Sequence, residues 1–565
     1  MSKAKPVPAA QKLPPRKVTV NEQKGFAIPY PLLWLAGAAF VVYFPTLFYK
    51  LTELDDSIFI RDFHDYNEQL GNLLTSFNRG LFEAIKDPYY RPLFMDSMIL
   101  NYQVSGGGEN IASYHFFNIV FHIISVVLLY KLLIKLEVNK VNSFILTLIF
   151  AVHPVLSQAV AWIPGRNDTM LAIFTLSFLI YSVDYSKDSK PRSLILSGLF
   201  LLLAFFTKET AVFVAPVAFV MVVYILKKNW RDPANVKQYL LWAAIFIFWF
   251  VARYFAVPHA DYLAPGQIAI DFLHRLPIIV QYIGKIFLPV NLSVFPIQED
   301  ASYLYGVIAI ILLAAALYYS KTRAMRMVWG GVAVFLLFLL PALFVPNNLN
   351  EQIFEHRLYL PIIGILLLLP QTVFLRNKFD DKQLFIGGVA VSCVLALLNF
   401  QHQRSFSDPK TFWEQAVATS PHSAFANMML GAREDDMQQS YALFRRAYQL
   451  NPREKYLNFY YGVMLQKEDS VKESEKYLLT EKNSSGYYEC DFYLARVAME
   501  RKDFNSAITD LQTYLTKDVH NKMANSNLLL LYLDTNQRDK AIIQAKHMQQ
   551  IGLAVPQALL TQLGI

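Results

Sequence analysis

The chain has few cysteines and few charged residues. The shortage of cysteine excludes one class of protein, and the shortage of charge distinguishes the chain from typical soluble domains. Two cysteines, Cys393 and Cys490, occur in 565 residues. A disulfide-stapled secreted scaffold needs several paired cysteines, so that class is excluded. Cysteine this sparse also favours a bacterial source. Charged residues make up only 17% of the chain, below the roughly 25% that is usual for soluble domains.

Apolar residues are abundant instead, at 54% of the chain, and they are clustered. Long runs occupy residues 32–44, 195–206, 334–345 and 360–370. So many runs of this length indicate a polytopic membrane protein. The first run follows about 30 polar residues, too late for a signal peptide, which favours an uncleaved anchor.

The net charge of +8 does not indicate nucleic-acid binding, because the basic residues lie in short connectors between apolar runs. The positive-inside rule places such connectors in the cytoplasm. Alternation across them predicts about eleven membrane helices, near residues 31–49, 114–135, 143–156, 169–185, 192–206, 209–226, 238–256, 302–320, 327–345, 357–375 and 382–400. The stretch 272–290 carries His274, Arg275 and Lys285, and we expect it to be re-entrant or to lie in the outer interface.

The composition changes after residue 401, where long apolar runs stop. Small residues recur there at Ala442, Ser474, Ala507 and Ala541, with spacings of 32, 33 and 34. This period, with the helix–turn–helix pattern of residues 492–515, predicts about four tetratricopeptide repeats in an α-solenoid. The expected fold is therefore all-α, with four parts: a cytoplasmic basic tail (1–28), a membrane domain (29–401), its first outer loop (51–112) and an extracytoplasmic repeat domain (402–565).

The predicted topology gathers five polar clusters on the extracytoplasmic side. They are Asp55–Asp56 after the first span, YYRPLF (89–94), HPVLSQAVAWIPGRND (153–168), TKET (207–210) and EHRLYLP (355–361). Polar groups at membrane depth are costly and usually functional. Pro154 and Pro164 should break a helix and deliver the polar residues around them to the middle of the membrane.

Each cluster also has a purely structural interpretation. The acid pair fits a solvated helix exit, and Arg91 or Arg357 fits a snorkelling side chain. Lys208 and Glu209 fit a neighbouring charge pair, as do Arg166 and Asp168. A further set, His115, Asn118 and His122, follows helical spacing and fits either polar packing or a wet cavity.

Carboxylates facing cations at a lipid surface suit glycosyl transfer from a polyprenyl phosphate. The phosphate is the leaving group, and cationic side chains stabilise the charge that develops on it. A carboxylate takes the proton of a hydroxyl acceptor as that hydroxyl attacks the anomeric carbon, which inverts in one displacement. Asp55 or Asp56 supplies this base, with a slight preference for Asp56, which lies deeper in the loop.

The ordered set of motifs resembles the transmembrane-and-TPR protein O-mannosyltransferases and their bacterial relatives, within the C-type membrane glycosyltransferases. The set comprises the acid pair, YRPL, HPV…GR.D, KET, E..LYLP and FWEQAV…P ahead of the repeats. Asn167 stands where alanine is usual, and Gln158 where glutamate is expected. The resemblance implies a polyprenyl-phosphate donor and a Ser/Thr acceptor on a translocated protein. The sugar is a single residue or a preassembled oligosaccharide on a diphosphate lipid.

Roles for individual residues follow from the motifs and the resemblance together. Asp55 and Asp56 are the catalytic candidates. The donor phosphate is assigned to six cationic or imidazole side chains: Arg91, His153, Arg166, Lys208, His356 and Arg357. Further residues expected around the site are Tyr90, His115, His122, Asp168, Glu209 and Glu355.

Other partners and rival functions follow from the same pattern. The repeats are expected to bind the acceptor protein, and the catalytic side is expected to be the periplasmic side of a bacterial inner membrane. The outer acids suit a divalent ion such as Mg²⁺ or Mn²⁺, although no ligand spacing demands a metal. The rival interpretations are a non-enzymatic membrane scaffold for envelope or secretion assembly and a transporter of lipid-linked sugars.

Overall fold

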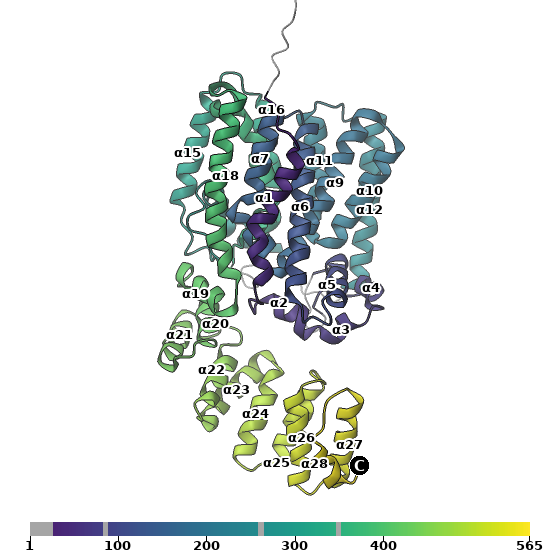
Figure 1. Cartoon of the computed structure of the whole chain (residues 1–565), viewed down its shortest axis with the longest axis vertical. Helices are drawn as coiled ribbons and strands as arrows, with labels where there is room; N and C mark the ends of the chain where they lie inside the picture. The colour runs from purple at the N-terminus through teal and green to yellow at the C-terminus, as the bar shows by residue number, and fades with distance from the viewer. Residues whose placement is uncertain (1–25, 83–88, 258–264, 346–351) are drawn as a thin grey trace, which may run out of the picture.

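The computed structural model describes residues 26–82, 89–257, 265–345 and 352–565. Most of the predicted basic tail therefore lies outside the described residues. The described part is helical, and its one β-bridge joins Ile297 and Gln352. Figure 1 shows a bundle of long helices with a curved array of shorter helices, α19–α28, extending from one end. We call this end of the bundle the site end.

Although the expected helices 209–226 and 357–375 are each divided into short helical pieces, the segments that the hydropathy pattern marked as helices lie in the bundle. Its helical elements are α1 (Pro31–Tyr43) with η1 (Phe44–Phe48), α6 (Ile111–Lys135), α7 (Lys140–Val152), η4 (Pro154–Leu156), α8 (Ser157–Ala161), η5 (Ile163–Gly165), α9 (Arg166–Asp188), α10 (Pro191–Thr207), η6 (Glu209–Phe213), α11 (Val214–Phe219), η7 (Val220–Ile225), α12 (Pro233–Ala256), α13 (Pro265–Arg275), α14 (Ile278–Phe287), α15 (Leu304–Tyr318), α16 (Met325–Leu343), η8 (Glu355–Leu358), α17 (Ile362–Leu368), η9 (Leu369–Gln371), η10 (Phe374–Lys378), α18 (Asp381–Gln403) and η11 (Arg404–Phe406).

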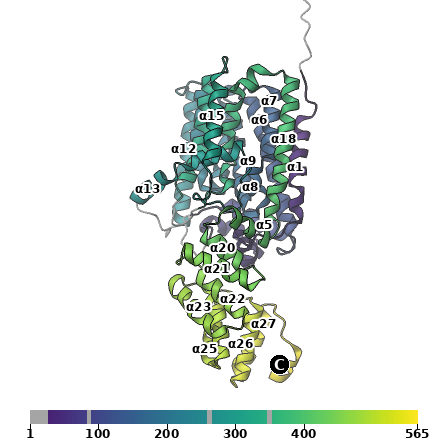
Figure 2. The same ribbon diagram turned by 90° about the vertical axis from the view of Figure 1, so that its left-hand side faces the viewer.

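Six helices in the described residues are long and apolar enough to cross a membrane, and a seventh is a bent pair. Three shorter apolar helices, Pro191–Thr207, Glu209–Ile225 and Leu304–Tyr318, accompany them. The chain is thus a multi-pass membrane protein, whereas the count of eleven spans stays a prediction. Two short helices, α13 and α14, occupy the ambiguous stretch 272–290, and α13 projects from the bundle (Figure 2).

Prolines interrupt the bundle where the sequence predicted a break. Helix α7 ends at Val152, before Pro154, and the chain bends by 51° between Lys140–Val152 and Pro154–Ala161. The expected helix 143–156 therefore stops earlier than predicted, because Pro154 cannot continue the hydrogen-bonded ladder. Pro164 opens a second turn, after which α9 begins at Arg166. These two breaks bring short, buried segments to the site end.

Glycines let two pairs of helices approach closely. A methyl group on Gly331 of α16 would lie 2.6 Å from the carbonyl oxygen of Gly364 in α17. Between α14 and α15, a methyl group on Gly306 would lie 1.9 Å from the carbonyl oxygen of Val280. Small residues at helix crossings are the usual means of close packing in membranes, where apolar side chains gain little by leaving lipid.

The described parts of the first loop, residues 49–82 and 89–110, fold over the site end as short helices. They are α2 (Asp55–Ser57), η2 (Ile58–Asp62), α3 (His64–Glu68), α4 (Asn72–Thr75), η3 (Ser76–Asn78) and α5 (Pro92–Val104). Phe59, Phe94 and Met98 form a small core of their own with Tyr114 of α6. Figure 1 shows these helices between the bundle and the C-terminal array.

The C-terminal array consists of α19 followed by four helical pairs and a last short helix. Its helices are α19 (Pro409–Thr419), α20 (Ala424–Gly431), α21 (Met437–Leu450), α22 (Leu457–Lys467), α23 (Val471–Ser485), α24 (Glu489–Glu500), α25 (Phe504–Leu515), α26 (Lys522–Asp534), α27 (Arg538–Gln550) and α28 (Gln557–Leu563). Aspartates or asparagines cap many of them, for example Asp436 on α21 and Asp503 on α25. Their assignment as tetratricopeptide repeats stays a prediction.

The small residues of the array follow the predicted period with one correction. Ser474, Ala507 and Ala541 are completely buried. Ala442, however, is exposed. Ser440, two residues earlier, is buried, and its hydroxyl donates to Gly431 O at 2.8 Å. The corrected spacings from Ser440 onward are 34, 33 and 34, which is more regular than the predicted series.

An aromatic cluster joins the array to the bundle. The ring of Trp413 in α19 lies 5.0 Å from that of Phe412, 5.5 Å from Phe295 and 5.6 Å from Phe425. Polar contacts reinforce the cluster, since the Gln415 side chain accepts from Val294 N and donates to Leu292 O, each at 2.9 Å. The array is therefore packed onto the bundle.

Replacing Trp413 by alanine should destabilise this junction. A Trp→Ala cavity in a packed cluster costs about 3–5 kcal/mol, so we expect a clear fall in the midpoint of thermal unfolding in detergent. The matched control is Trp329→Ala on α16, whose side chain is 56% exposed. Equal midpoints for the two variants would contradict the packing described here.

Candidate functional site

Asp56 stabilises the turn that follows the first helix. Its Oδ2 atom accepts hydrogen bonds from Thr52 N at 2.6 Å and Thr52 Oγ1 at 3.0 Å. Its Oδ1 atom accepts from Ser57 N at 3.0 Å and Leu54 N at 3.2 Å. The side chain is 1% exposed. Both carboxylate oxygens are thus committed to the local backbone.

Asp55 has the opposite environment. It is half-buried at the start of α2, and within the described part of the chain its carboxylate makes no hydrogen bond or ion pair. Burial, followed by the adjacent charge of Asp56, raises the pKa of Asp55 to about 6, while the charge of Arg91 opposes that rise. A carboxylate with this pKa is mostly ionised at neutral pH and is a stronger base than an ordinary aspartate.

Glu209 fastens the first loop to the bundle. Its Oε2 atom lies 3.0 Å from Arg91 Nε, and its Oε1 atom accepts from Tyr90 N at 2.5 Å. The Arg91 guanidinium also lies over the ring of Tyr89, 4.5 Å from its centroid. The YYRPLF and TKET motifs, about 120 residues apart, therefore meet directly.

Lys208 pairs with a different acid from a different helix. Its Nζ atom lies 2.6 Å from Asp168 Oδ1, and both side chains are about nine-tenths buried. The purely structural alternative, a pair between Asp168 and Arg166, is therefore not what the structure shows. Lys208 and Glu209 are thus adjacent in sequence but serve two separate ion pairs.

Cationic groups converge at this end of the bundle. The charges of Lys208, Arg357 and Arg91 all act on His356, and those of Arg91 and Arg357 act on Lys208. Arg357 donates to Gln352 O at 2.9 Å and has no acidic partner among the described residues. After Glu209 and Asp168 neutralise Arg91 and Lys208, the positive charge of Arg357 remains uncompensated.

His356 is held by a residue that departs from the family motif. Its backbone nitrogen and its Nδ1 atom both lie 3.1 Å from Gln158 Oε1. The imidazole also packs against the rings of Phe354 and Trp162. Glutamine at position 158 thus supplies a neutral acceptor where glutamate would add a negative charge beside the cations.

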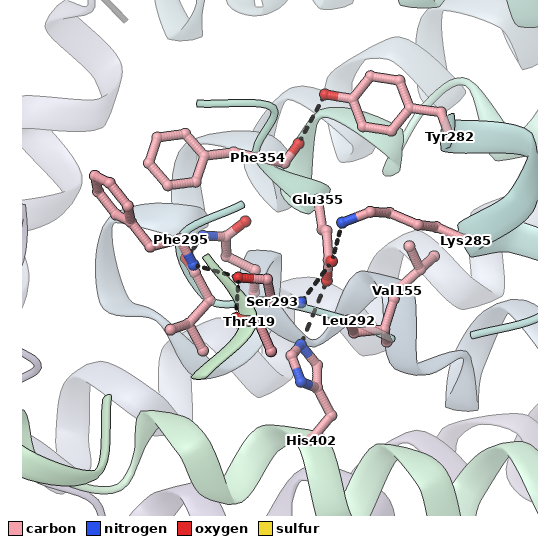
Figure 3. A network of polar contacts seen from close by, with 12 residues as sticks. Val155, Tyr282, Lys285, Leu292, Ser293, Phe295, Phe354, Glu355, His402 and Thr419 are labelled. Atoms are coloured by element: carbon pink, nitrogen blue, oxygen red, sulfur yellow. Dashed lines mark hydrogen bonds and ion pairs between the residues drawn. The ribbon is translucent and has the colours of Figure 1, made fainter. Parts of the chain in front are cut away.

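Glu355 occupies the centre of a buried network that links bundle and array (Figure 3). Its Oε1 atom lies 2.6 Å from Lys285 Nζ and accepts from Ser293 N at 2.9 Å, and its Oε2 atom lies 3.4 Å from His402 Nε2. Thr419 of α19 donates to the hydroxyl of Ser293 at 2.6 Å. Glu355 is completely buried, so the geometry assigns it a structural role.

Arg166 and His153 also act within the protein framework. The Arg166 guanidinium donates to Asn118 Oδ1, Ser97 O, Asn101 Oδ1 and Tyr114 O, at 2.7 to 3.2 Å. It therefore joins α5 to α6 and retains no group directed at a ligand.

His153 makes its contacts at the proline break. Its Nε2 atom donates to Ile286 O at 2.9 Å, and its Nδ1 atom accepts from Val155 N at 3.2 Å. Like Arg166, it is satisfied by protein groups and is poorly placed to bind a donor phosphate.

The histidines of α6 differ from one another. His122 lies 2.6 Å from Tyr359 Oη and 3.0 Å from Ala151 O, which matches the polar-packing interpretation. His115 is 1% exposed, and neither ring nitrogen has a hydrogen-bond partner within the described residues. Its ring packs edge-on against Tyr49 of the first loop.

Neither a metal-ligand cluster nor the larger of two cavities coincides with Asp55 in the part of the chain that the structure describes. The described ranges hold no group of three or more His, Cys, Asp or Glu arranged to bind a metal. A cavity of about 390 Å³ lies at the opposite end of the bundle, lined by residues that include Arg326, Gln371 and Asp381.

The Glu355–Lys285 pair should show strong coupling in stability measurements. Breaking a buried pair from one side costs about 3–5 kcal/mol, because the other charge stays buried without a partner. We expect Glu355→Gln and Lys285→Met each to lower the thermal midpoint markedly. The double variant should lose less than the sum of the single effects, and additive losses would contradict the pairing.

Comparison with known proteins places this geometry in context. Residues 96–255, which include Asp168, Lys208 and Glu209, match the family described as dolichyl-phosphate-mannose-protein mannosyltransferase. The mouse protein O-mannosyl-transferase TMTC1 is 34% identical over 140 residues, covering 24% of this chain and 15% of that protein. Mouse TMTC3 is 36% identical over 102 residues, 18% of this chain and 10% of that protein. The protein O-mannosyl-transferase F38B6.6 of Caenorhabditis elegans is 32% identical over 132 residues, 23% of this chain and 18% of that protein.

The aligned stretches span less than a fifth of these relatives. The family model covers residues 96–255, one part of the bundle with the end of the first loop. It covers the Lys208–Asp168 ion pair, Glu209 and the GR.D element, but not Arg91, Asp55 or Asp56. Within these limits the matches confirm the resemblance that the ordered motifs predicted: the chain is similar to membrane glycosyltransferases of the protein O-mannosyltransferase type.

Proposed function

We propose that this protein transfers a sugar or a preassembled oligosaccharide from a polyprenyl-linked phosphate or diphosphate to Ser/Thr hydroxyls of translocated proteins. The observation that carries the proposal is the placement of one uncommitted carboxylate, Asp55, within the electrostatic reach of Arg91 at the site end. The similarity to protein O-mannosyl-transferases supports the reaction class. The site end then faces the periplasm of a bacterial inner membrane.

Asp55 is the general base of this mechanism, in place of Asp56. The acceptor oxygen attacks the anomeric carbon, its proton passes to the Asp55 carboxylate, and the carbon–oxygen bond to the phosphate breaks with both electrons leaving on the phosphate. The anomeric carbon inverts in this single displacement. Asp56 is a positioning residue, because its four hydrogen bonds fix the turn that presents Asp55.

Arg91, Lys208 and Arg357 receive the donor phosphate. Of the three, Arg357 is the best placed to bind the phosphate, because its charge is uncompensated. Its guanidinium can also bind two phosphate oxygens at once in a fixed geometry. Arg91 and Lys208 retain acidic partners and add to the local potential.

A Mg²⁺ or Mn²⁺ ion is often held by one or two carboxylates together with substrate phosphates. Here it would have to share the Asp55 carboxylate, because Asp56, Asp168 and Glu209 already have partners.

Asp55→Asn should abolish most of the transfer while the protein still inserts and folds. Loss of a general base costs on the order of 10²–10⁴ in rate. In the wild type, kcat/KM should fall with decreasing pH below about 6, because protonated Asp55 cannot accept a proton. Asp56→Asn removes the neighbouring negative charge and should shift this limb to lower pH.

These measurements use reconstituted protein, a polyprenyl-linked sugar and a Ser/Thr peptide. Wild-type rates for Asp55→Asn would exclude Asp55 as the base. An acid limb near the ordinary aspartate pKa of 3.8 would also contradict the assignment.

Arg357→Ala should weaken the use of the donor. A hydrogen bond to a charged group contributes about 1.5–3 kcal/mol, so kcat/KM for the donor should fall by roughly 10- to 100-fold. The matched control is Arg192→Ala at the exposed start of α10. Unchanged donor kinetics in the Arg357 variant would place the phosphate elsewhere.

A further inference from the structure

A cavity of about 320 Å³ lies where the C-terminal array meets the first loop. This volume is at the lower end of the range for small-ligand pockets, roughly 300–1,000 Å³. Its walls come from α20–α22 and α24 of the array and from Glu53 of the first loop. The lining residues are Glu53, Gly431, Ala432, Arg433, Glu434, Met437, Ser440, Phe459, Tyr460, Val463, Met464, Lys467 and Tyr493.

The cavity combines an apolar interior with a charged rim. Met437, Phe459, Val463 and Met464 supply flexible and aromatic surface, which suits apolar side chains of varied shape. Lys467 is exposed and, like the hydroxyls of Tyr460 and Tyr493, makes no hydrogen bond or ion pair within the described residues. Such hydroxyls are suited to hydrogen bonds with a peptide backbone.

An ion pair at the edge of the cavity connects the array to the first loop. Arg433 Nη2 lies 2.9 Å from Glu53 Oε2, and its Nε atom lies 3.2 Å from the same oxygen. Glu53 has φ of +55°, a left-handed conformation that costs a non-glycine residue roughly 1–2 kcal/mol. Contacts with Arg433 and Arg61 hold Glu53 in place.

Chain geometry sets the distance from the cavity to the proposed base. Glu53 precedes Asp55 by two residues, so their Cα atoms are at most about 7 Å apart. An extended peptide advances about 3.3 Å per residue. A side chain in the cavity and a hydroxyl at Asp55 therefore belong to residues only a few positions apart in one polypeptide.

We propose that this cavity binds one apolar or aromatic side chain of the acceptor polypeptide and thereby selects which nearby Ser or Thr is glycosylated. The inference rests on the proposed function and assigns its acceptor specificity to named residues. A lipid tail fits less well, because the cavity belongs to the polar array and has Glu53, Arg433, Glu434 and Lys467 around it. An extended peptide satisfies both the apolar interior and the polar rim.

The test uses the full chain in lipid nanodiscs and a set of fluorescent peptides, each with a single Thr. Leu, Phe or Asp is placed in turn at each of the four positions on either side of that Thr. Binding is measured without donor by fluorescence anisotropy, and transfer is measured with donor. We expect Leu or Phe at one or two adjacent positions to lower Kd and KM at least tenfold relative to Asp.

Two substitutions of one residue provide opposite changes in size. Val463→Trp fills the cavity and should remove the preference for Leu or Phe, whereas Val463→Ala enlarges it and should shift the preference from Leu towards Phe. The matched control is Met523→Trp on α26, 62% exposed and remote from the cavity, which should keep the wild-type preference. Loss of the preference in Val463→Trp together with a shift towards Phe in Val463→Ala cannot result from misfolding.

The two arms separate this inference from the proposed function. Equal Kd values for all peptides, or a wild-type preference in both Val463 variants, would overturn the cavity as the acceptor site even if transfer is observed. Peptide binding that depends on position and changes in the Val463 variants would support the cavity as the acceptor site, even if no sugar is transferred. A failure to transfer sugar from the donor would instead overturn the proposed reaction.

Discussion

Two ion pairs made by the neighbouring residues Lys208 and Glu209 determine where the other parts of the site lie. Lys208 binds Asp168 at the start of α9, and Glu209 binds Arg91 in the first loop. Charges in so buried a place cost several kcal/mol unless they are paired, so both contacts constrain the fold. With the loop attached here, the turn of Asp56 and the free carboxylate of Asp55 take up fixed positions. Arg357 and Asp55 are then the site charges that have no ion-pair partner among the described residues.

A second constraint operates at the junction with the array. Glu355 neutralises Lys285 and contacts His402, while Thr419 of α19 reaches the same network through Ser293. The residue that follows, His356, faces the cationic cluster. One short helical turn, η8, thus belongs to both the junction and the site. A change in the position of the array would therefore reach the cationic residues that we propose bind the donor phosphate.

The sequence indicated the helices and the breaks because single residues control them. Apolar runs marked the bundle, Pro154 and Pro164 marked its interruptions, and the polar motifs marked residues that indeed gather at one end. The roles of individual side chains were less accessible. Asp56 was preferred as the base. Its four hydrogen bonds, which occupy both carboxylate oxygens, depend on a backbone turn that the neighbouring residues in the sequence do not reveal. Arg166 and His153 carried the right chemistry for phosphate, but their partners are carbonyls and amides distant in sequence.

Other contacts in the structure could not be predicted from the sequence. Arg433 and Glu53 are 380 residues apart, and nothing in either local pattern connects them. His402 is a lone histidine at a helix end, a position with many ordinary explanations. The periodic pattern selected Ala442, whereas the structure buries Ser440 two residues earlier. Both fit a period near 33, and only the rotation of α21 about its axis decides which one faces inward.

The packed junction has a consequence for building hybrid proteins. Helix α18 ends at Gln403, and α19 begins at Pro409 after a single 3₁₀ turn, so no flexible linker separates bundle from array. Trp413 and Gln415 bind the loop at residues 292–295, and these contacts make α19 a structural part of the bundle. A chimera that exchanges repeat arrays should therefore be spliced after α19, not at the change in composition near residue 401. Splicing near residue 401 would separate Trp413 and Gln415 from the loop at residues 292–295. The apolar contact surface on the bundle would then be exposed.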